Sequence, residues 1–192
     1  MEAVGGVLSA FGLAASAGLN AYVPLLIVAL VARFTDWIEL GATWEPLTSW
    51  WVIGVLLVLG LVEFFADKIP AVNHANDVIQ TFVRPAAGAV LFAASTNVVT
   101  DIHPVVAIIA GLLVAGGVHL VKSAAVRPAV SVTTGGVANV PVSIAEDILA
   151  TILSILAIIV PVVVAVVLIL LTATVIWLLW RRANRSMQAP RA

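Results

Sequence analysis

Long runs of apolar residues, several of them close to the length of a membrane-spanning helix, constrain this chain more than any other feature of its sequence. A helix needs about 20 apolar residues to cross a bilayer core of about 30 Å, because each residue adds about 1.5 Å. Only 10% of the residues are charged, whereas soluble domains carry roughly 25%. These observations exclude an ordinary water-soluble globule. They predict an all-α membrane protein that forms a single polytopic domain over residues 1–192.

The apolar runs predict six transmembrane helices. The last run, residues 148–180, has 33 residues, or about 50 Å of straight helix, which is more than one crossing needs. Pro161 lies inside this run, and a proline kinks or breaks a helix, so the run is one kinked span or two spans. With two spans, the predicted segments are 8–31, 50–66, 79–99, 105–121, 144–160 and 161–180, followed by a basic tail at 181–192.

The positive charges favour six spans over five. With six spans, eight Lys and Arg residues lie on the same side as both termini, and only Arg33 lies on the other side. Cytoplasmic loops of membrane proteins are enriched in Lys and Arg, and with five spans the bias would vanish. The first span has no basic segment before it, so we expect it to be retained rather than cleaved as a signal peptide. We therefore expect a multi-pass protein of the inner (plasma) membrane with both termini cytoplasmic.

Two internal similarities favour different repeats. Residues 12–20 align with residues 111–119, which places Asn20 opposite His119. Because the first and fourth predicted spans cross in opposite directions, this match indicates an inverted repeat of three plus three spans, as in many transporters. The tetrapeptide VRPA occurs at 83–86 and again at 126–129, which instead favours parallel hairpins. The sequence leaves both arrangements open.

The first of two polar segments on the predicted inner side begins at Glu63. Glu63 and Asp67 are four residues apart, so on a helix both carboxylates lie on one face. An unpaired carboxylate inside a span is costly. We interpret the pair as an ion-, proton- or substrate-binding site. The alternative is a structural ion pair with Lys68 or Arg84.

The second polar segment begins at His119 and Lys122, which are three residues apart and share a helical face. We expect both to join the same site, although a histidine at the end of a span is often only an interfacial hydrogen-bonding group. Arg84 and Arg127 each precede a proline and are interpreted as cytoplasmic anchors. The uncharged stretch 129–143 predicts a broken, re-entrant or cavity-lining segment, or else a loop on the bilayer surface.

Three further polar residues belong to the predicted site. Asn20 interrupts the first span, where interhelical hydrogen bonding explains it as well as a binding role does. His74 and Asp77 are of types that bind divalent metals, but two ligands do not make a metal centre, so no metal and no cofactor is predicted. The candidate ion- or substrate-binding residues are Asn20, Glu63, Asp67, Lys68, His74, Asp77, Arg84, His119 and Lys122.

Three stretches carry a family resemblance: GLAASAGLNAYVPLL, EFFADKIPAVNHANDVIQTFVRPAAGA, and HLVKSAAVRP followed by EDIL. They resemble domain-of-unknown-function family 4126, an uncharacterised family of small bacterial integral-membrane proteins, over nearly the whole chain. The resemblance implies an inner-membrane protein with related polar segments, and it implies no established substrate, reaction or cofactor. Asn20 stands where family members often carry a basic residue, which weakens the hypothesis that a charge is essential there.

The first functional hypothesis is a small transporter or channel that moves an ion or small solute through a polar site near the inner leaflet. The alternative is a membrane scaffold or assembly partner whose buried charges are structural ion pairs. We do not expect an enzyme, because the sequence has no recognisable nucleophile motif, HExxH or P-loop. The expected partners are the lipid bilayer, an unknown small solute or ion, and a second copy of the chain. The net charge of −1 does not favour nucleic acid.

Overall fold

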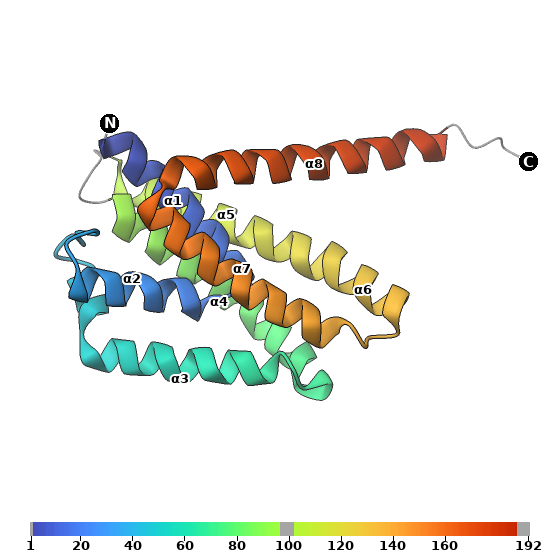
Figure 1. Ribbon diagram of the computed structural model, residues 1–192, viewed down its shortest axis with the longest axis horizontal. Helices are drawn as coiled ribbons and strands as arrows, with labels where there is room; N and C mark the ends of the chain where they lie inside the picture. Colours follow the sequence, from blue (N-terminus) through green and yellow to red (C-terminus); the bar gives the residue numbers. More distant parts are fainter. Residues whose placement is uncertain (1, 97–101, 188–192) are drawn as a thin grey trace, which may run out of the picture.

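The computed structural model describes residues 2–96 and 102–187, and all regular secondary structure within these ranges is helical. This confirms the predicted all-α class. Figure 1 shows an elongated bundle from which α8 extends along one side. The elements are α1 (Glu2–Leu19), α2 (Tyr22–Phe34), η1 (Glu45–Thr48), α3 (Trp50–Ala66), α4 (Pro70–Thr96), α5 (Pro104–Val121), η2 (Lys122–Val126), α6 (Arg127–Thr134), α7 (Asn139–Ile159) and α8 (Pro161–Met187).

Three helical stretches within the described ranges are long and apolar enough to cross a membrane. They are Asn76–Thr96 in α4, Pro104–Thr134 and Asn139–Ile159 in α7. The second is one continuous helix made of α5, the π-helical turn η2 and α6. The wide turn η2 ends just before Pro128, whose ring clashes with the carbonyl four residues earlier in a regular helix. These helices support the assignment as a membrane protein.

The helix boundaries agree with the sequence in two places. α3 covers the predicted segment 50–66, and Ser49 begins it by accepting a hydrogen bond from the N–H of Val52 at 3.4 Å. The run 148–180 is divided between α7 and α8, which meet at Val160. Pro161 begins α8, a position where proline is tolerated because its missing N–H would have no helical partner.

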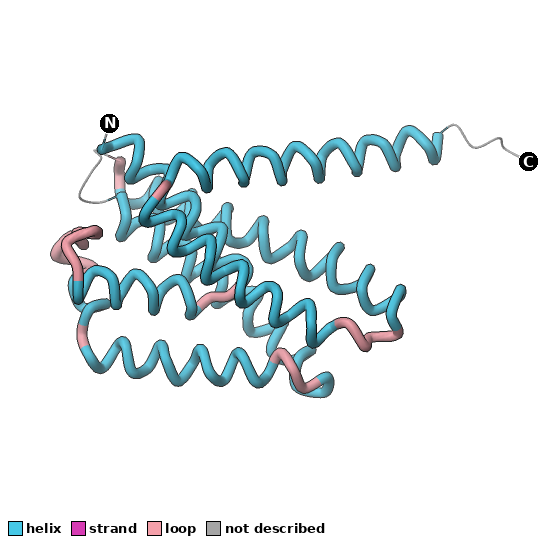
Figure 2. Tube along the Cα trace, in the orientation of Figure 1, coloured by secondary structure: helices cyan, strands magenta, loops and turns pink. Residues whose placement is uncertain are grey.

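The prediction of one continuous helix over 8–31 is wrong, because the chain reverses direction at Asn20. α1 runs antiparallel to α7, since the Ser9 hydroxyl donates to Ala157 O at 2.6 Å and the Ser16 hydroxyl donates to Ala150 O at 2.8 Å. α2 then returns along α3, and at its end Arg33 Nη1 donates to Thr48 O at 2.7 Å. Figure 2 shows the short break between α1 and α2 inside the bundle.

The reversal at Asn20 has a local cause. Asn20 Oδ1 accepts hydrogen bonds from the backbone N–H groups of Tyr22 at 3.1 Å and Val23 at 3.0 Å. This side chain therefore caps the first turn of α2, as asparagine commonly does. α1 and α2 form a hairpin whose two outer ends lie at one end of the bundle, whereas α8 ends at the other (Figure 1).

The non-helical backbone predicted over 129–143, as a re-entrant or cavity-lining segment or as a surface loop, is also wrong outside a turn at 135–138. α6 ends at Thr134 and α7 begins at Asn139, so the stretch is helical on both sides of a short turn. Gly135 and Gly136 have φ values of 62° and 87°, which glycine adopts without a steric cost. Ser131 and Asn139 hydrogen-bond to each other across the turn at 3.1 Å. The stretch is thus the connection of a helical hairpin.

The helix directions do not support either predicted repeat. α1 and α5, which carry the match between 12–20 and 111–119, run in the same direction (Figure 1), whereas an inverted repeat requires opposite directions. The two VRPA copies lie on α4 and at the start of α6. α4 runs antiparallel to α5, which continues through η2 into α6, because Thr81 contacts His119 and Gly88 contacts Gly111. The copies therefore do not occupy equivalent arms of parallel hairpins.

Small residues let α1, α4 and α5 approach one another closely. A Cβ atom on Gly88 would lie 2.8 Å from Gly111 O and would collide with the Ala115 side chain. A Cβ atom on Gly18 would lie 2.6 Å from Ala115 O. This close packing holds the polar faces of α4 and α5 together beside the end of α1.

Candidate functional site: a buried charge network

Charged side chains from α3, α4, α5, η2, α6 and α7 gather at the end of the bundle where α3 leads into α4. Most of them are buried, although they lie in or next to apolar helices. We call this group the charge network. Its members are Glu63, Asp67, Lys68, Asp77, Arg84, His119, Lys122, Arg127, Glu146 and Asp147.

The deepest part of the network is the ion pair between Glu63 and Arg84. Arg84 Nη2 donates to Glu63 Oε1 at 2.8 Å, and Arg84 Nε donates to the same oxygen at 3.3 Å. The two side chains are 0% and 1% exposed. This pair was one of the two alternatives predicted from the sequence. It links α3 to α4 in the interior.

His119 joins this pair as a neutral imidazole. Arg84 Nη1 lies 3.1 Å from His119 Nδ1, and because a guanidinium can only donate, Nδ1 accepts. His119 Nε2 lies 3.2 Å from the Thr81 hydroxyl, which donates its own hydrogen to Asp77 O at 2.9 Å. Nε2 therefore carries the hydrogen. This tautomer is inferred from the hydrogen-bond pattern.

Asp67, directly after α3, is surrounded by donors. It accepts hydrogen bonds from Arg127 Nη2 at 3.1 Å, from Asn76 Nδ2 at 2.8 Å and from the Ser143 hydroxyl at 3.3 Å. Burial would raise the pKa of Asp67, but the positive charges of Arg127 and Lys122, among others, and the bond from Asn76 outweigh it. The pKa of Asp67 is therefore lower than its usual value, and the group is ionised at neutral pH.

Arg127, interpreted from the sequence as a cytoplasmic anchor, connects three carboxylates. Besides Asp67, its guanidinium contacts Glu146 Oε2 at 3.3 Å and Asp77 Oδ2 at 3.3 Å. Glu146 Oε2 also lies 2.7 Å from Lys122 Nζ. Because these contacts come from four helical elements, they tie α3, α4, η2–α6 and α7 together.

The tip of the α1–α2 hairpin is bound to the network at two points. Lys122 Nζ donates to Leu19 O, the last residue of α1, at 2.9 Å. Asn20 Nδ2 donates to Asp147 Oδ1 at 2.9 Å. Asp147 also pairs with Lys68 at 3.4 Å, and both side chains are 16% exposed. This last pair is thus the more accessible edge of the network.

The structure brings together eight of the nine residues predicted for the site. The ninth, His74, lies in α4, but its side chain is outside the described part of the structure. The sequence prediction missed Arg127, Glu146 and Asp147 as members. The second VRPA copy and the acidic pair after the turn at 135–138 were the signals that could have found them.

The network contains more acceptors than its donors satisfy. Glu63 Oε2 and Gln80 Oε1 are buried and have no hydrogen-bond partner. The carboxylates number five and the Lys and Arg side chains number four, and His119 is neutral. In the described residues, no group of three or more His, Cys, Asp or Glu side chains is placed to hold a metal ion. The surplus of acceptors is one that a proton could reduce.

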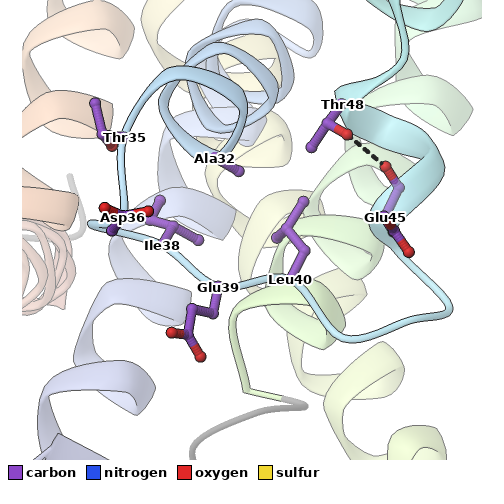
Figure 3. Close-up of a pocket in the computed structure, with 8 residues that line it drawn as sticks. All are labelled: Ala32, Thr35, Asp36, Ile38, Glu39, Leu40, Glu45 and Thr48. Atoms are coloured by element: carbon purple, nitrogen blue, oxygen red, sulfur yellow. Dashed lines mark hydrogen bonds between the residues drawn. The ribbon is translucent and has the colours of Figure 1, made fainter.

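A separate surface cavity of about 390 Å³ lies at the opposite end of the bundle, between the end of α2 and η1. None of the nine predicted site residues lines it. Figure 3 shows that the carboxylates of Asp36, Glu39 and Glu45 lie apart around this cavity and do not converge on one point. All three are exposed. The cavity is therefore a solvated acidic hollow and not part of the charge network.

A comparison with known protein families identifies the family to which this chain belongs. The family described as "Domain of unknown function (DUF4126)" matches residues 7–181. No curated protein matches the chain, and no solved structure matches it. The matched range contains every residue of the charge network.

Proposed function

We propose a function for this chain, which belongs to the DUF4126 family, from the charge network itself, because the family's description names no activity. The protein moves a small ion or solute across a membrane, and the charge network is its binding site. The observation that carries this proposal is the helix break at Asn20, which lies against the network. Two hydrogen bonds hold it there, one from Lys122 to Leu19 O and one from Asn20 to Asp147. Interrupted helices that end at a polar site recur in transporters. Ionisable groups inside membrane helices mark transport pathways.

The proposed topology has five crossings, by α3, α4, α5 with α6, α7 and α8. The α1–α2 hairpin enters and leaves on one side, because the 13 residues of α2 make about 20 Å of helix, less than a bilayer core. Exposed Trp37, Trp50 and Trp51 near one end, and Trp177 and Trp180 near the end of α8, suit the two membrane interfaces. This topology replaces the expected six spans.

The proposed orientation follows the positive charges. The junction of α3 with α4 and the end of α6 lie toward the end of the bundle at which α8 finishes, and the end of α2 lies at the other (Figure 1). The charge network with its four Lys and Arg side chains gathers at the first of these ends, and Arg33 is in the last turn of α2. The positive-inside rule then makes the network end cytoplasmic. The start of α1 consequently faces the outside and the end of α8 the cytoplasm. In this proposal the two termini of the chain lie on opposite sides of an inner membrane, not on the same side as the sequence suggested.

The test is a transport measurement on the full chain in proteoliposomes, by solid-supported-membrane electrophysiology. The panel contains protons, monovalent and divalent cations, halides, phosphate and small organic acids. We expect transport of one solute by the wild type, seen as a transient current if net charge moves and as isotope uptake if it does not, and we expect Glu63→Gln to lose it. The control is Glu39→Gln, the same change at an exposed residue outside the network, which should keep the current. A folded, oriented wild type that is silent in this assay and in isotope uptake would refute transport.

A second candidate function is a membrane scaffold whose charges lock its helices together. The observation that favours it is that each of the five network carboxylates has a Lys or Arg nitrogen within 3.4 Å. In a scaffold, Glu63→Gln would lower the unfolding temperature because Arg84 loses its buried counter-charge. Because a scaffold transports nothing, the wild type and Glu63→Gln would both show no flux. Measuring flux and thermal stability on the same variant distinguishes the two functions.

A further inference from the structure

In the ion pair between Glu63 and Arg84, only one of the two carboxylate oxygens of Glu63 accepts hydrogen bonds. Both Arg84 nitrogens, Nε and Nη2, donate to Oε1 of Glu63. The other oxygen, Oε2, is buried and has no hydrogen-bond partner. A buried acceptor without a donor is costly. A proton on Oε2 removes that cost, because it turns the oxygen into a donor and neutralises the carboxylate.

A second buried acceptor without a partner lies on the neighbouring helix α4. Gln80 is one turn before Arg84 on α4, so the two side chains share a face. Gln80 Oε1 is also buried without a partner. A proton on Glu63 Oε2 would therefore remove one of these two unpartnered acceptors.

The net charge of the network also favours uptake of a proton. Five carboxylates face four Lys and Arg side chains, and His119, the remaining titratable neighbour, accepts from Arg84 as a neutral ring. The network thus carries one negative charge in excess. A buried uncompensated charge is unfavourable. Uptake of one proton balances the network.

Arg84 is the cation that this proton would release. Arg127 is held by Asp67, Asp77 and Glu146, and Lys122 is held by Glu146 and by Leu19 O. Lys68 pairs with Asp147 at the accessible edge. Apart from Glu63, the nearest carboxylate to Arg84 is Asp67, at 3.8 Å, and Asp67 already accepts from three other side chains. Neutral Glu63 would leave Arg84 short of a counter-charge.

We propose that protonation of Glu63 at Oε2 releases Arg84 to bind a small carboxylate anion, so that one proton and one anion bind the network together. The proton comes from water, the ion pair between Glu63 and Arg84 breaks, and the anion takes the place of the Glu63 carboxylate. The planar guanidinium edge formed by Nε and Nη2 offers two parallel donors that match a carboxylate. Because proton and anion enter together, the net charge of the network does not change. This inference rests on the proposed transport function and names its cargo.

The test is equilibrium binding of acetate to the full chain in nanodiscs, measured by titration calorimetry across a pH series. Buffers with different ionisation enthalpies report the protons taken up. For the wild type we expect one proton per acetate, and linkage then weakens the affinity about tenfold per pH unit as the pH rises. Glu63→Gln, which imitates the protonated side chain, should bind acetate independently of pH and without proton uptake. Arg84→Gln should bind none, and the control Glu39→Gln should match the wild type.

Three results would overturn the inference: wild-type binding without proton uptake, no acetate binding at all, or chloride binding as tightly as acetate. The wild-type measurement alone decides the first, so the test does not depend on the folding of a variant. Failure of this inference is distinguishable from failure of the transport function. Acetate binding with proton uptake, but without flux in proteoliposomes, supports the site and refutes transport. Flux of another solute without acetate binding refutes the inference and keeps transport.

Discussion

The two ends of the bundle both carry acidic side chains, but only one end buries them. At the end formed by the loop between α2 and α3, Asp36, Glu39 and Glu45 are exposed around a surface hollow. Arg33 at this end donates to a backbone carbonyl and lies 4.3 Å over the ring of Trp50. At the network end, Glu63 is 1% exposed. The same residue types therefore exist in two different environments.

The difference follows from what covers each end. The network is enclosed because α7 is tied to η2 and α6 through Glu146. The tip of the α1–α2 hairpin covers it as well, through the contacts from Asn20 to Asp147 and from Leu19 to Lys122. The loop end carries its acidic residues on segments outside the long helices. Solvated charges contribute little to stability, whereas enclosed charges must be paired. Chemistry that depends on desolvated charge is thus confined to the network end.

Arg84→Gln should have the largest effect of any single change in the comparison. It leaves the carboxylate of Glu63 buried without a cation, and breaking a buried pair in this way costs about 3–5 kcal/mol. The matched change at the loop end, Arg33→Gln, should cost less, because Arg33 is exposed and a cation–π contact at an exposed site is worth about 0.5–1 kcal/mol. Denaturation with SDS in mixed micelles measures both. Equal losses for the two variants would contradict the contrast between the ends.

Asp67→Asn should have the next largest effect, and its size should depend on pH. At neutral pH the variant loses charge-assisted hydrogen bonds, each worth about 1.5–3 kcal/mol. The pKa of Asp67 is lowered in the folded protein, so its contribution is present above the unfolded-state pKa and is lost as the pH falls through the folded value.

The stability difference between the wild type and Asp67→Asn should accordingly shrink on acidification. The measurement is the unfolding temperature of both proteins in detergent from neutral to acidic pH. Glu45→Gln at the loop end is the control, and its difference from the wild type should stay near zero throughout. A difference that is constant with pH would mean that the Asp67 carboxylate does not stabilise the fold.

The sequence predicted the helices better than their directions. Hydropathy indicated α3 over 50–66, and Pro161 indicated the break before α8, because both signals are local. The reversal at Asn20 was missed, because a hydropathy window adds apolar residues on both sides of a turn without detecting it. The capping bonds from Tyr22 and Val23 to Asn20 are a local signal, and asparagine before a helix-forming stretch could have revealed them.

The sequence predicted two carboxylates of the site, Glu63 and Asp67, but only some of the Lys and Arg residues that pair with its carboxylates. The spacing of Glu63 and Asp67 placed two carboxylates on one face, and Arg84 was named as one partner for Glu63. Arg127 was interpreted only as a cytoplasmic anchor, because its partners, Asp67 and Glu146, come from other parts of the chain. Such contacts depend on how α3, α6 and α7 pack, which a single sequence does not reveal.

Asn20→Ala should have a smaller effect on stability, and this effect should be confined to the tip of the α1–α2 hairpin. The change removes the cap of α2, worth about 1 kcal/mol, and the hydrogen bond to Asp147. We expect a modest loss of stability together with faster amide hydrogen exchange in the first turn of α2. Exchange in α3 at the loop end should stay the same. Uniform acceleration in all helices would mean that Asn20 supports the whole fold and not the tip alone.

Glu39→Gln should have the smallest effect and tests the other side of the comparison. Glu39 is exposed on the loop between α2 and η1, and surface substitutions away from buried contacts usually change stability by less than about 0.5 kcal/mol. The stability of this variant in mixed micelles, its acetate binding and its flux should all equal those of the wild type. If Glu39→Gln altered flux as Glu63→Gln does, the carboxylates of the exposed hollow would belong to the transport pathway, and burial would not be what distinguishes the functional end.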